Sequence, residues 1–199
     1  MERELKELLG TEDPVDHAVF ACIASHGIQN VTMDIVARAV GRSRTSFYRQ
    51  FTSWQELVAR THRRTVGLID GWFPPPRGDR RLELERLWSS LMAFLSSAWG
   101  HAFLAMRPHL ASEYGISEVE FLEMRRMPTF VRWVDSSPLV ARTVWALVLT
   151  AGCPSLRARE RHVMRELVWS RFICSGVDVD PDEVDLSRAH PLGGFLSLQ

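Results

Sequence analysis

The chain has 199 residues, of which 46% are hydrophobic and 24% are charged, and its formal net charge is zero. This balance is typical of a soluble globular protein with one or two domains. Its three cysteines lack a CxxC spacing, which argues against a disulfide framework and against a structural zinc site. Residues 1–10 do not resemble a secretory signal, and the most apolar stretch, 144–149, is too short to span a membrane. We therefore expect a cytoplasmic protein without a membrane partner.

The apolar spacing predicts helices along the whole chain and no sheet, so the expected fold class is all-α. A first helix should begin at Asp13, an N-cap acid followed by proline, and end at Gly27. Thr32 is expected to cap a short second helix, which Gly41 ends.

Two further helices follow closely. Ser43 is the predicted N-cap of a helix that runs to Phe51, and Ser53 is the predicted N-cap of a longer helix that runs towards Trp72. A loop rich in proline and glycine then covers residues 74–79. Beyond this loop, helices are predicted over residues 82–99, 102–114, 117–135, 138–151 and 156–175.

The basic residues are unevenly distributed. Between Arg38 and Arg64 there are seven arginines and one acid, Glu56. Phosphate binding requires such a local positive patch, because each neutralised phosphate releases condensed counterions. The alternative interpretation is a solvated helix face, which is common for clusters of charges.

Residues 31–51 contain two short helices that meet at a tight turn around Gly41, with small residues at Ala37 and Ala39 that allow close packing. This pattern is typical of a helix-turn-helix, whose second helix enters the major groove of DNA. The second helix carries short hydrogen-bond donors, arginines and a tyrosine, which suit contacts with phosphates and base edges. The predicted DNA-binding residues are Thr32, Arg42, Ser43, Arg44, Thr45, Ser46, Tyr48, Arg49 and Trp54.

The segment from about Asp16 to Thr61 resembles the DNA-binding domain of the TetR family of transcription regulators. That family shows a threonine-capped helix with an Ile-Ala core pair, then a G-x-S-x-x-x-hydrophobic-Tyr-x-x-Phe segment and a serine-capped helix. The matching residues are His26, Gly27, Thr32, Ile35, Ala37, Ala39, Gly41, Ser43, Phe47, Tyr48, Phe51, Ser53 and Leu57.

Two positions depart from the family pattern. Thr45 stands where a glycine is frequent, and Trp54 stands where a lysine often contacts phosphate. The indole N–H of Trp54 can still donate one hydrogen bond, but it supplies no charge. For Trp54, packing against Tyr48 or the first helix and a contact with the DNA backbone are equally compatible with the sequence.

The resemblance implies a homodimer that binds a palindromic operator, most often as a repressor, and that responds to a ligand. It divides the chain into a DNA-binding domain over 13–60, a helical ligand-binding and dimerisation domain over 61–176, and an irregular tail over 177–199. The aromatic content of the second domain favours a small apolar or aromatic effector. The candidate pocket residues are Trp88, Met92, Trp99, Phe103, Phe121 and Trp133.

Two late helices carry apolar side chains at helical spacing and are the candidate dimer interface. Paired with the same helices of a second subunit, they would form a four-helix bundle. The candidate interface residues are Leu139, Thr143, Leu147, Val163, Leu167 and Phe172.

Two other classes of function remain as alternatives. An enzyme is disfavoured because the chain contains no GxSxG, HExxH, GxGxxG or P-loop pattern, so we expect no catalytic residues, metal or cofactor. An interaction protein that kept the fold is disfavoured by the intact Arg42, Ser43, Arg44 and Tyr48. Salt-dependent binding to a palindromic duplex distinguishes a regulator from both.

Overall fold

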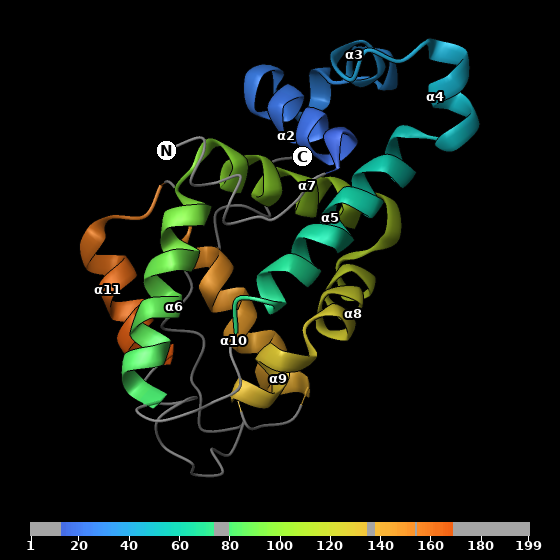
Figure 1. The fold of residues 1–199 in the computed structure, drawn as a ribbon. Helices are drawn as coiled ribbons and strands as arrows, with labels where there is room; N and C mark the ends of the chain where they lie inside the picture. Colours follow the sequence, from blue (N-terminus) through green and yellow to red (C-terminus); the bar gives the residue numbers. More distant parts are fainter. Residues whose placement is uncertain (1–12, 74–79, 135–137, 154, 169–199) are drawn as a thin grey trace.

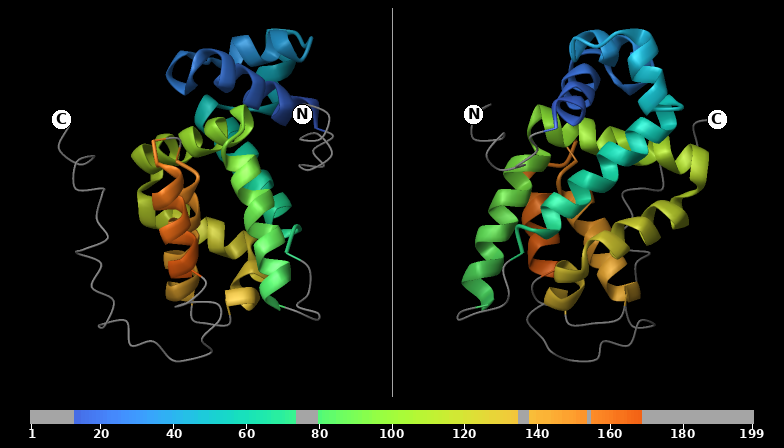
Figure 2. Two further views of the ribbon diagram at one scale, coloured as in Figure 1. Left: turned by 90° about the vertical axis from the view of Figure 1, so that its left-hand side faces the viewer. Right: turned by 45° about the vertical axis from the view of Figure 1, so that its right-hand side comes forward.

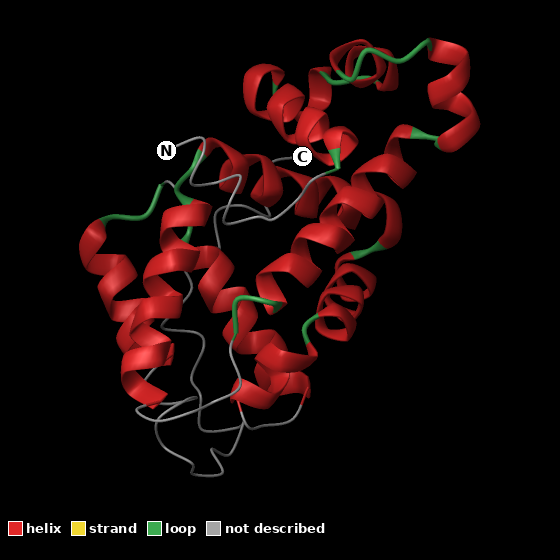
Figure 3. Ribbon diagram, viewed as in Figure 1, coloured by secondary structure: helices red, strands yellow, loops and turns green. Residues whose placement is uncertain are grey.

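A computed structural model describes residues 13–73, 80–134, 138–153 and 155–168. Within these ranges the chain forms helices and connecting loops and no strand, which confirms the all-α prediction (Figure 3). The predicted tail over 177–199 lies outside the described residues. The helices, in chain order, are α2 (Pro14–His26), η1 (Ile28–Asn30), α3 (Met33–Ala39), α4 (Arg44–Gln50), α5 (Trp54–Asp70), α6 (Arg80–Leu95), α7 (Ala98–Tyr114), α8 (Ile116–Arg126), α9 (Pro128–Val134), α10 (Pro138–Ala151) and α11 (Ala158–Leu167).

Helices α2, α3 and α4 form one end of the molecule, and α4 lies at its outer edge (Figures 1 and 2). Their shared core is apolar and almost fully buried, which fixes the relative positions of three short helices. Its buried residues include Val15, Val19, Ile23, Val36 and Phe47, together with Phe51 and Leu57, which follow α4.

Helix α5 connects this end to the rest of the molecule, because its first turns follow α4 and its last turn reaches α9 (Figure 1). The carboxylate of Asp70, the last residue of α5, accepts hydrogen bonds from the backbone N–H groups of Thr129 and Phe130, at 3.2 Å and 2.8 Å. Both acceptor contacts satisfy amides in the first turn of α9, which have no partner within the helix. The two ends of α5 are therefore attached to different parts of the fold.

Helix α7 is the central helix of the larger region and packs against α2, α5, α6 and α8. It continues through Pro108 without interruption. Its close approach to α6 depends on Gly100, where an added Cβ would lie 2.1 Å from the carbonyl oxygen of Phe94 and 2.5 Å from Cα of Leu95. Glycine is thus required for the sharp turn between α6 and α7.

The predicted starts at Asp13, Ser43 and Ser53 are confirmed. The three side chains accept hydrogen bonds from the backbone N–H groups of Val15, Ser46 and Glu56, respectively. Thr32 occupies the N-cap position of α3, but its hydroxyl makes no capping hydrogen bond, so this detail of the prediction was wrong.

Two predicted helix boundaries were wrong. The helix expected over 117–135 is interrupted at Met127, because Pro128 follows it and a residue before proline is disfavoured in the α conformation. The helix expected over 82–99 ends at Leu95, and Ser97 caps the next helix by accepting a hydrogen bond from the N–H of Gly100 at 3.1 Å.

Candidate nucleic-acid interface and internal cavity

The turn between α3 and α4 places the candidate recognition helix at the surface. Gly41 has φ of +71°, a conformation that side chains other than glycine rarely adopt. The N–H of Arg42 donates to the carbonyl of Ala37 at 2.9 Å, and this bond closes the turn. Phe47 is fully buried beneath α4, so the opposite face of that helix points to solvent.

The exposed face of α4 carries the predicted DNA-binding side chains. Thr45, Ser46 and Arg49 are exposed. The side chain of Arg44 is 74% exposed, and its Nε lies 3.3 Å from Oδ1 of Asp34 in α3. The Arg44 guanidinium also lies over the ring of Tyr48, 5.4 Å from the ring centroid. These contacts orient Arg44 without removing it from solvent.

Two further predicted residues lie beside α4. Arg42 donates a hydrogen bond to the side-chain oxygen of Gln50, which holds its guanidinium along the exposed surface. Thr32 is exposed at the start of α3. Thr32, at the start of α3, and residues 42–49, in and before α4, therefore belong to two helices that lie at the outer end of the molecule (Figure 1).

The arginine patch predicted between residues 38 and 64 does not form one surface. Arg60 Nη2 lies 2.6 Å from Asp13 Oδ2, and Arg64 pairs with both Asp13 and Asp16. These two arginines attach α5 to the start of α2 and are neutralised there. The acids that precede the patch in sequence thus compensate its last part in space.

Trp54 contacts a helix that the sequence analysis did not consider. It is half-buried, and its ring centroid lies 6.5 Å from that of His109 in α7, with the planes tilted by 56°. Because α7 is far along the chain from Trp54, this contact could not be predicted from local sequence patterns. Trp54 therefore joins the start of α5 to the larger helical region.

The helix-turn-helix geometry and the polar surface of α4 agree with a comparison against protein families. Residues 17–61 match the model of the bacterial regulatory proteins, tetR family. The chain carries a TetR-family DNA-binding domain. No curated protein and no solved structure matches the chain significantly.

The TetR domain indicates a DNA-binding transcription regulator. In the described part of the chain, no helix has the length and apolar character of a membrane span. The matched segment ends within α5, so the TetR domain and the larger helical region share this helix.

Below the TetR domain, a cavity of about 370 Å³ lies between α5, α7 and α8. Ligand sites in proteins commonly have volumes of about 300–1,000 Å³, so this space suits a small organic molecule. Its lining residues are Glu56, Ala59, His62, Arg63, Val66, Leu110, Tyr114, Glu118, Val119, Leu122 and Glu123.

A buried polar pair closes the inner end of the cavity. His62 Nε2 in α5 lies 3.3 Å from Glu123 Oε1 in α8, and their side chains are 4% and 1% exposed. The His62 ring also stacks on Phe103 of α7, with centroids 5.0 Å apart and planes 6° apart. The inner end therefore joins all three helices of the cavity.

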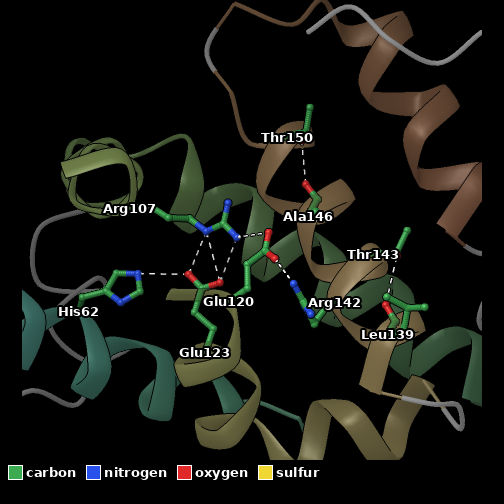
Figure 4. Close-up of polar contacts among 9 residues, drawn as sticks. All are labelled: His62, Arg107, Glu120, Glu123, Leu139, Arg142, Thr143, Ala146 and Thr150. Atoms are coloured by element: carbon green, nitrogen blue, oxygen red, sulfur yellow. Dashed lines mark hydrogen bonds and ion pairs between the residues drawn. The ribbon is translucent and has the colours of Figure 1, made fainter. Parts of the chain in front are cut away.

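The pair is the first part of a longer network (Figure 4). Arg107 of α7 contacts both Glu123 and Glu120, through Nε at 3.0 Å and Nη2 at 3.3 Å, respectively. Glu120 in turn pairs with Arg142 of α10. Burial raises the pKa of Glu123, but the contacts with His62 and Arg107 outweigh it and hold that pKa below its usual range. Glu123 is therefore an anion at neutral pH.

The six residues predicted for the ligand pocket do not line this cavity. Trp88, Trp99, Phe103 and Trp133 are buried in the hydrophobic core, and Met92 is packed against it. Phe121 is 53% exposed and lies beneath the guanidinium of Arg125. Of the six, Phe103 is linked to the cavity, through its contact with His62.

The predicted dimer residues lie on α10 and α11, which pack against each other. Leu139 and Val163 are both 59% exposed. Thr143, Leu147 and Leu167 are half-buried. Phe172 lies outside the described residues.

Proposed function

We propose that the protein is a ligand-responsive transcription regulator, specifically a repressor, that acts as a homodimer on a palindromic operator. The observation that carries this proposal is the position of α5. This helix begins next to α4 and supplies Ala59, His62, Arg63 and Val66 to the cavity lining. A molecule in the cavity thus contacts the helix that holds the recognition helix.

The proposed DNA contacts divide into two kinds. Arg44 has a guanidinium that can reach the edge of a guanine, where a good bidentate contact discriminates by roughly 1–3 kcal/mol. The exposed Tyr48 offers its hydroxyl to a phosphate, which positions the protein without reading sequence. The other residues proposed to contact DNA phosphates or bases are Thr32, Arg42, Ser43, Thr45, Ser46, Arg49 and Trp54.

Dimerisation is proposed through α10 and α11. Their exposed Leu139 and Val163 give each protomer an apolar surface that a second copy can cover in an isologous contact. Two recognition helices then meet major-groove faces roughly 34–36 Å apart, or a multiple of that spacing, which matches a palindromic site.

Ligand response follows from linkage. A ligand that favours a different separation of the two recognition helices weakens DNA binding, and DNA weakens ligand binding by the same factor. We accordingly assign DNA binding to residues 13–60 and ligand binding and dimerisation to residues 61–176, with α5 crossing the boundary. A site of action on DNA also places the protein in the cytoplasm.

DNA binding is tested by fluorescence anisotropy with duplexes from the region upstream of the protein's own gene, at several salt concentrations. We expect a palindromic duplex to bind more tightly than its scrambled form, and affinity to fall as salt rises. Arg44→Ala should weaken binding, whereas Arg125→Ala, an exposed arginine on α8, should not. Weak, sequence-independent binding by the wild-type protein would contradict a regulatory role for this site.

Dimerisation is tested by sedimentation velocity. Val163→Asp places a charge at the centre of the proposed apolar contact and should produce monomers. Ile116→Asp is the matched control, because Ile116 is similarly exposed but lies at the start of α8. If both variants sediment like the wild-type protein, α11 is not in the interface.

A further inference from the structure

Between the buried His62–Glu123 pair at its inner end and its opening to solvent, the cavity has aliphatic walls and then an acidic rim. Val66, Leu110 and Val119 are buried and form aliphatic walls. Glu56 and Glu118 are exposed at the rim. A bound molecule therefore meets aliphatic walls along the cavity and carboxylates at its opening, while the His62–Glu123 pair lies at the inner end.

The buried carboxylate of Glu123, at the inner end of the cavity, already has its charge partners within the protein. Arg107 contacts both oxygens of Glu123, through Nε at 3.0 Å from Oε1 and Nη2 at 3.2 Å from Oε2. His62 contacts Oε1 as well. The charge of Glu123 is thus compensated by the protein, and a ligand with a second buried charge would have to be desolvated without a free partner.

The rim has one uncompensated charge. Glu56 accepts hydrogen bonds from the backbone and the hydroxyl of Thr52, and these bonds, with the nearby Arg63, lower its pKa despite a small opposing effect of burial. Arg63 is the one guanidinium of the lining, and Glu56 balances its charge. The carboxylate of Glu118 has no hydrogen-bond or ion-pair partner among the residues that the structure describes. The opening therefore carries a net negative charge.

We propose that this cavity binds an organic cation, whose apolar body lies against the aliphatic walls and whose charged group lies beside Glu118 at the rim. The inference rests on the proposed ligand-responsive function and specifies the class of its ligand. An anion of the same shape is repelled by the net negative charge of the rim. A neutral molecule gains only the apolar contact with the walls. Because the rim is exposed, the attraction is moderate and is weakened by salt.

The test uses three probes of nearly equal shape: phenylbutylamine, phenylbutanol and phenylbutanoate. Their binding to the full-length protein without DNA is measured by isothermal titration calorimetry at neutral pH and low salt. We expect the amine to bind about threefold to fivefold more tightly than the alcohol, the size of an exposed ion pair. The carboxylate should bind more weakly than the alcohol, and added salt should reduce these differences.

Two pairs of variants locate the binding site. Leu122→Trp fills the cavity from a lining position and should abolish amine binding, whereas Phe121→Trp, at the neighbouring exposed position, should not change it. Glu118→Gln should lower the affinity for the amine to that for the alcohol. Glu113→Gln is its control, because Glu113 is exposed on α7 and does not line the cavity.

The inference is overturned if no probe binds, if the carboxylate binds most tightly, or if Leu122→Trp and Phe121→Trp bind the amine equally. Because calorimetry is done without DNA, these outcomes are independent of operator binding. Amine binding that leaves operator affinity unchanged would support the ligand class and contradict the ligand-responsive function.

Discussion

The hydroxyl of Thr61 donates a 2.8 Å hydrogen bond to the carboxylate of Asp16, inside the contact between α5 and α2. Asp16 is almost completely buried. Burial raises the pKa of its carboxyl, and the hydrogen bond from Thr61 and the charge of Arg64 offset this effect in part. The folded protein therefore favours the protonated form of Asp16 more than the unfolded chain does.

This shift predicts a pH dependence of stability with a defined sign. An acid with a raised pKa contributes stability that is fully present below its unfolded pKa of 3.8 and is lost as pH rises through the folded value. Asp16→Asn keeps an oxygen that accepts from Thr61 but does not ionise. The free energy of unfolding of this variant, relative to wild type, should therefore increase as pH rises from about 4 to 7.

Chemical denaturation at a series of pH values measures this difference. Thr61→Val removes the donor and should raise the pKa of Asp16 further, so its loss of stability with rising pH should be steeper than that of wild type. A constant difference between Asp16→Asn and wild type at every pH would show that Asp16 does not titrate in this range.

Tyr48→Phe should weaken DNA binding by about threefold to tenfold, the worth of one hydrogen bond. Because a phosphate contact carries no sequence information, the loss should be similar for the operator and for duplexes with single base changes. Anisotropy measurements with such a set of duplexes test this. A loss confined to one base position would instead assign Tyr48 to base recognition.

Trp54→Ala should destabilise the protein by about 0.5–3 kcal/mol, because it removes the ring that packs against His109. Its effect on the salt dependence of DNA binding should be negligible, since no phosphate charge is lost. Trp54→Phe retains an aromatic ring and is the control for stability. A smaller salt slope in Trp54→Ala would instead indicate that this variant makes fewer phosphate contacts.

Two glycine substitutions should act in opposite directions. Gly100→Ala places Cβ against backbone atoms of Phe94 and Leu95, so it should destabilise the protein by about 1–3 kcal/mol. Gly67→Ala is also in a helix but has no atom within 4 Å of the new Cβ. It should stabilise the protein by about 0.4–1 kcal/mol through the unfolded chain, and thermal unfolding of the two variants gives the comparison.

The TetR domain could be predicted closely because its signals are local. The caps at Asp13, Ser43 and Ser53 and the turn at Gly41 each depend on residues a few positions apart. Pro128 was an equally local signal for the break between α8 and α9, but the apolar spacing across it masked the boundary. Local rules therefore located the recognition helix and its exposed face.

The cavity could not be predicted from local sequence patterns, because its lining residues come from segments that are far apart in the chain. His62 and Glu123 are separated by two intervening helices, and no spacing in the sequence relates them. Aromatic content pointed instead to Trp99 and Trp133, which the structure uses as core. Large apolar side chains fill the core of every globular protein, so their abundance does not distinguish residues that line a ligand pocket from residues that pack in the core.

Helix α5 is attached to α2 along its first half and to α9 at its last residue, so a small rotation of the helix about one attachment displaces its other end. With its 17 residues and a rise of about 1.5 Å each, α5 is about 25 Å long. Arg60 and Thr61 attach its upper part to α2, and Asp70 attaches its lower end to α9. A tilt of about 5° about the lower attachment would move the upper end by about 2 Å over this length. In the proposed homodimer the two displacements would combine across the symmetry axis, so a small change beside the cavity would alter the distance between the two recognition helices.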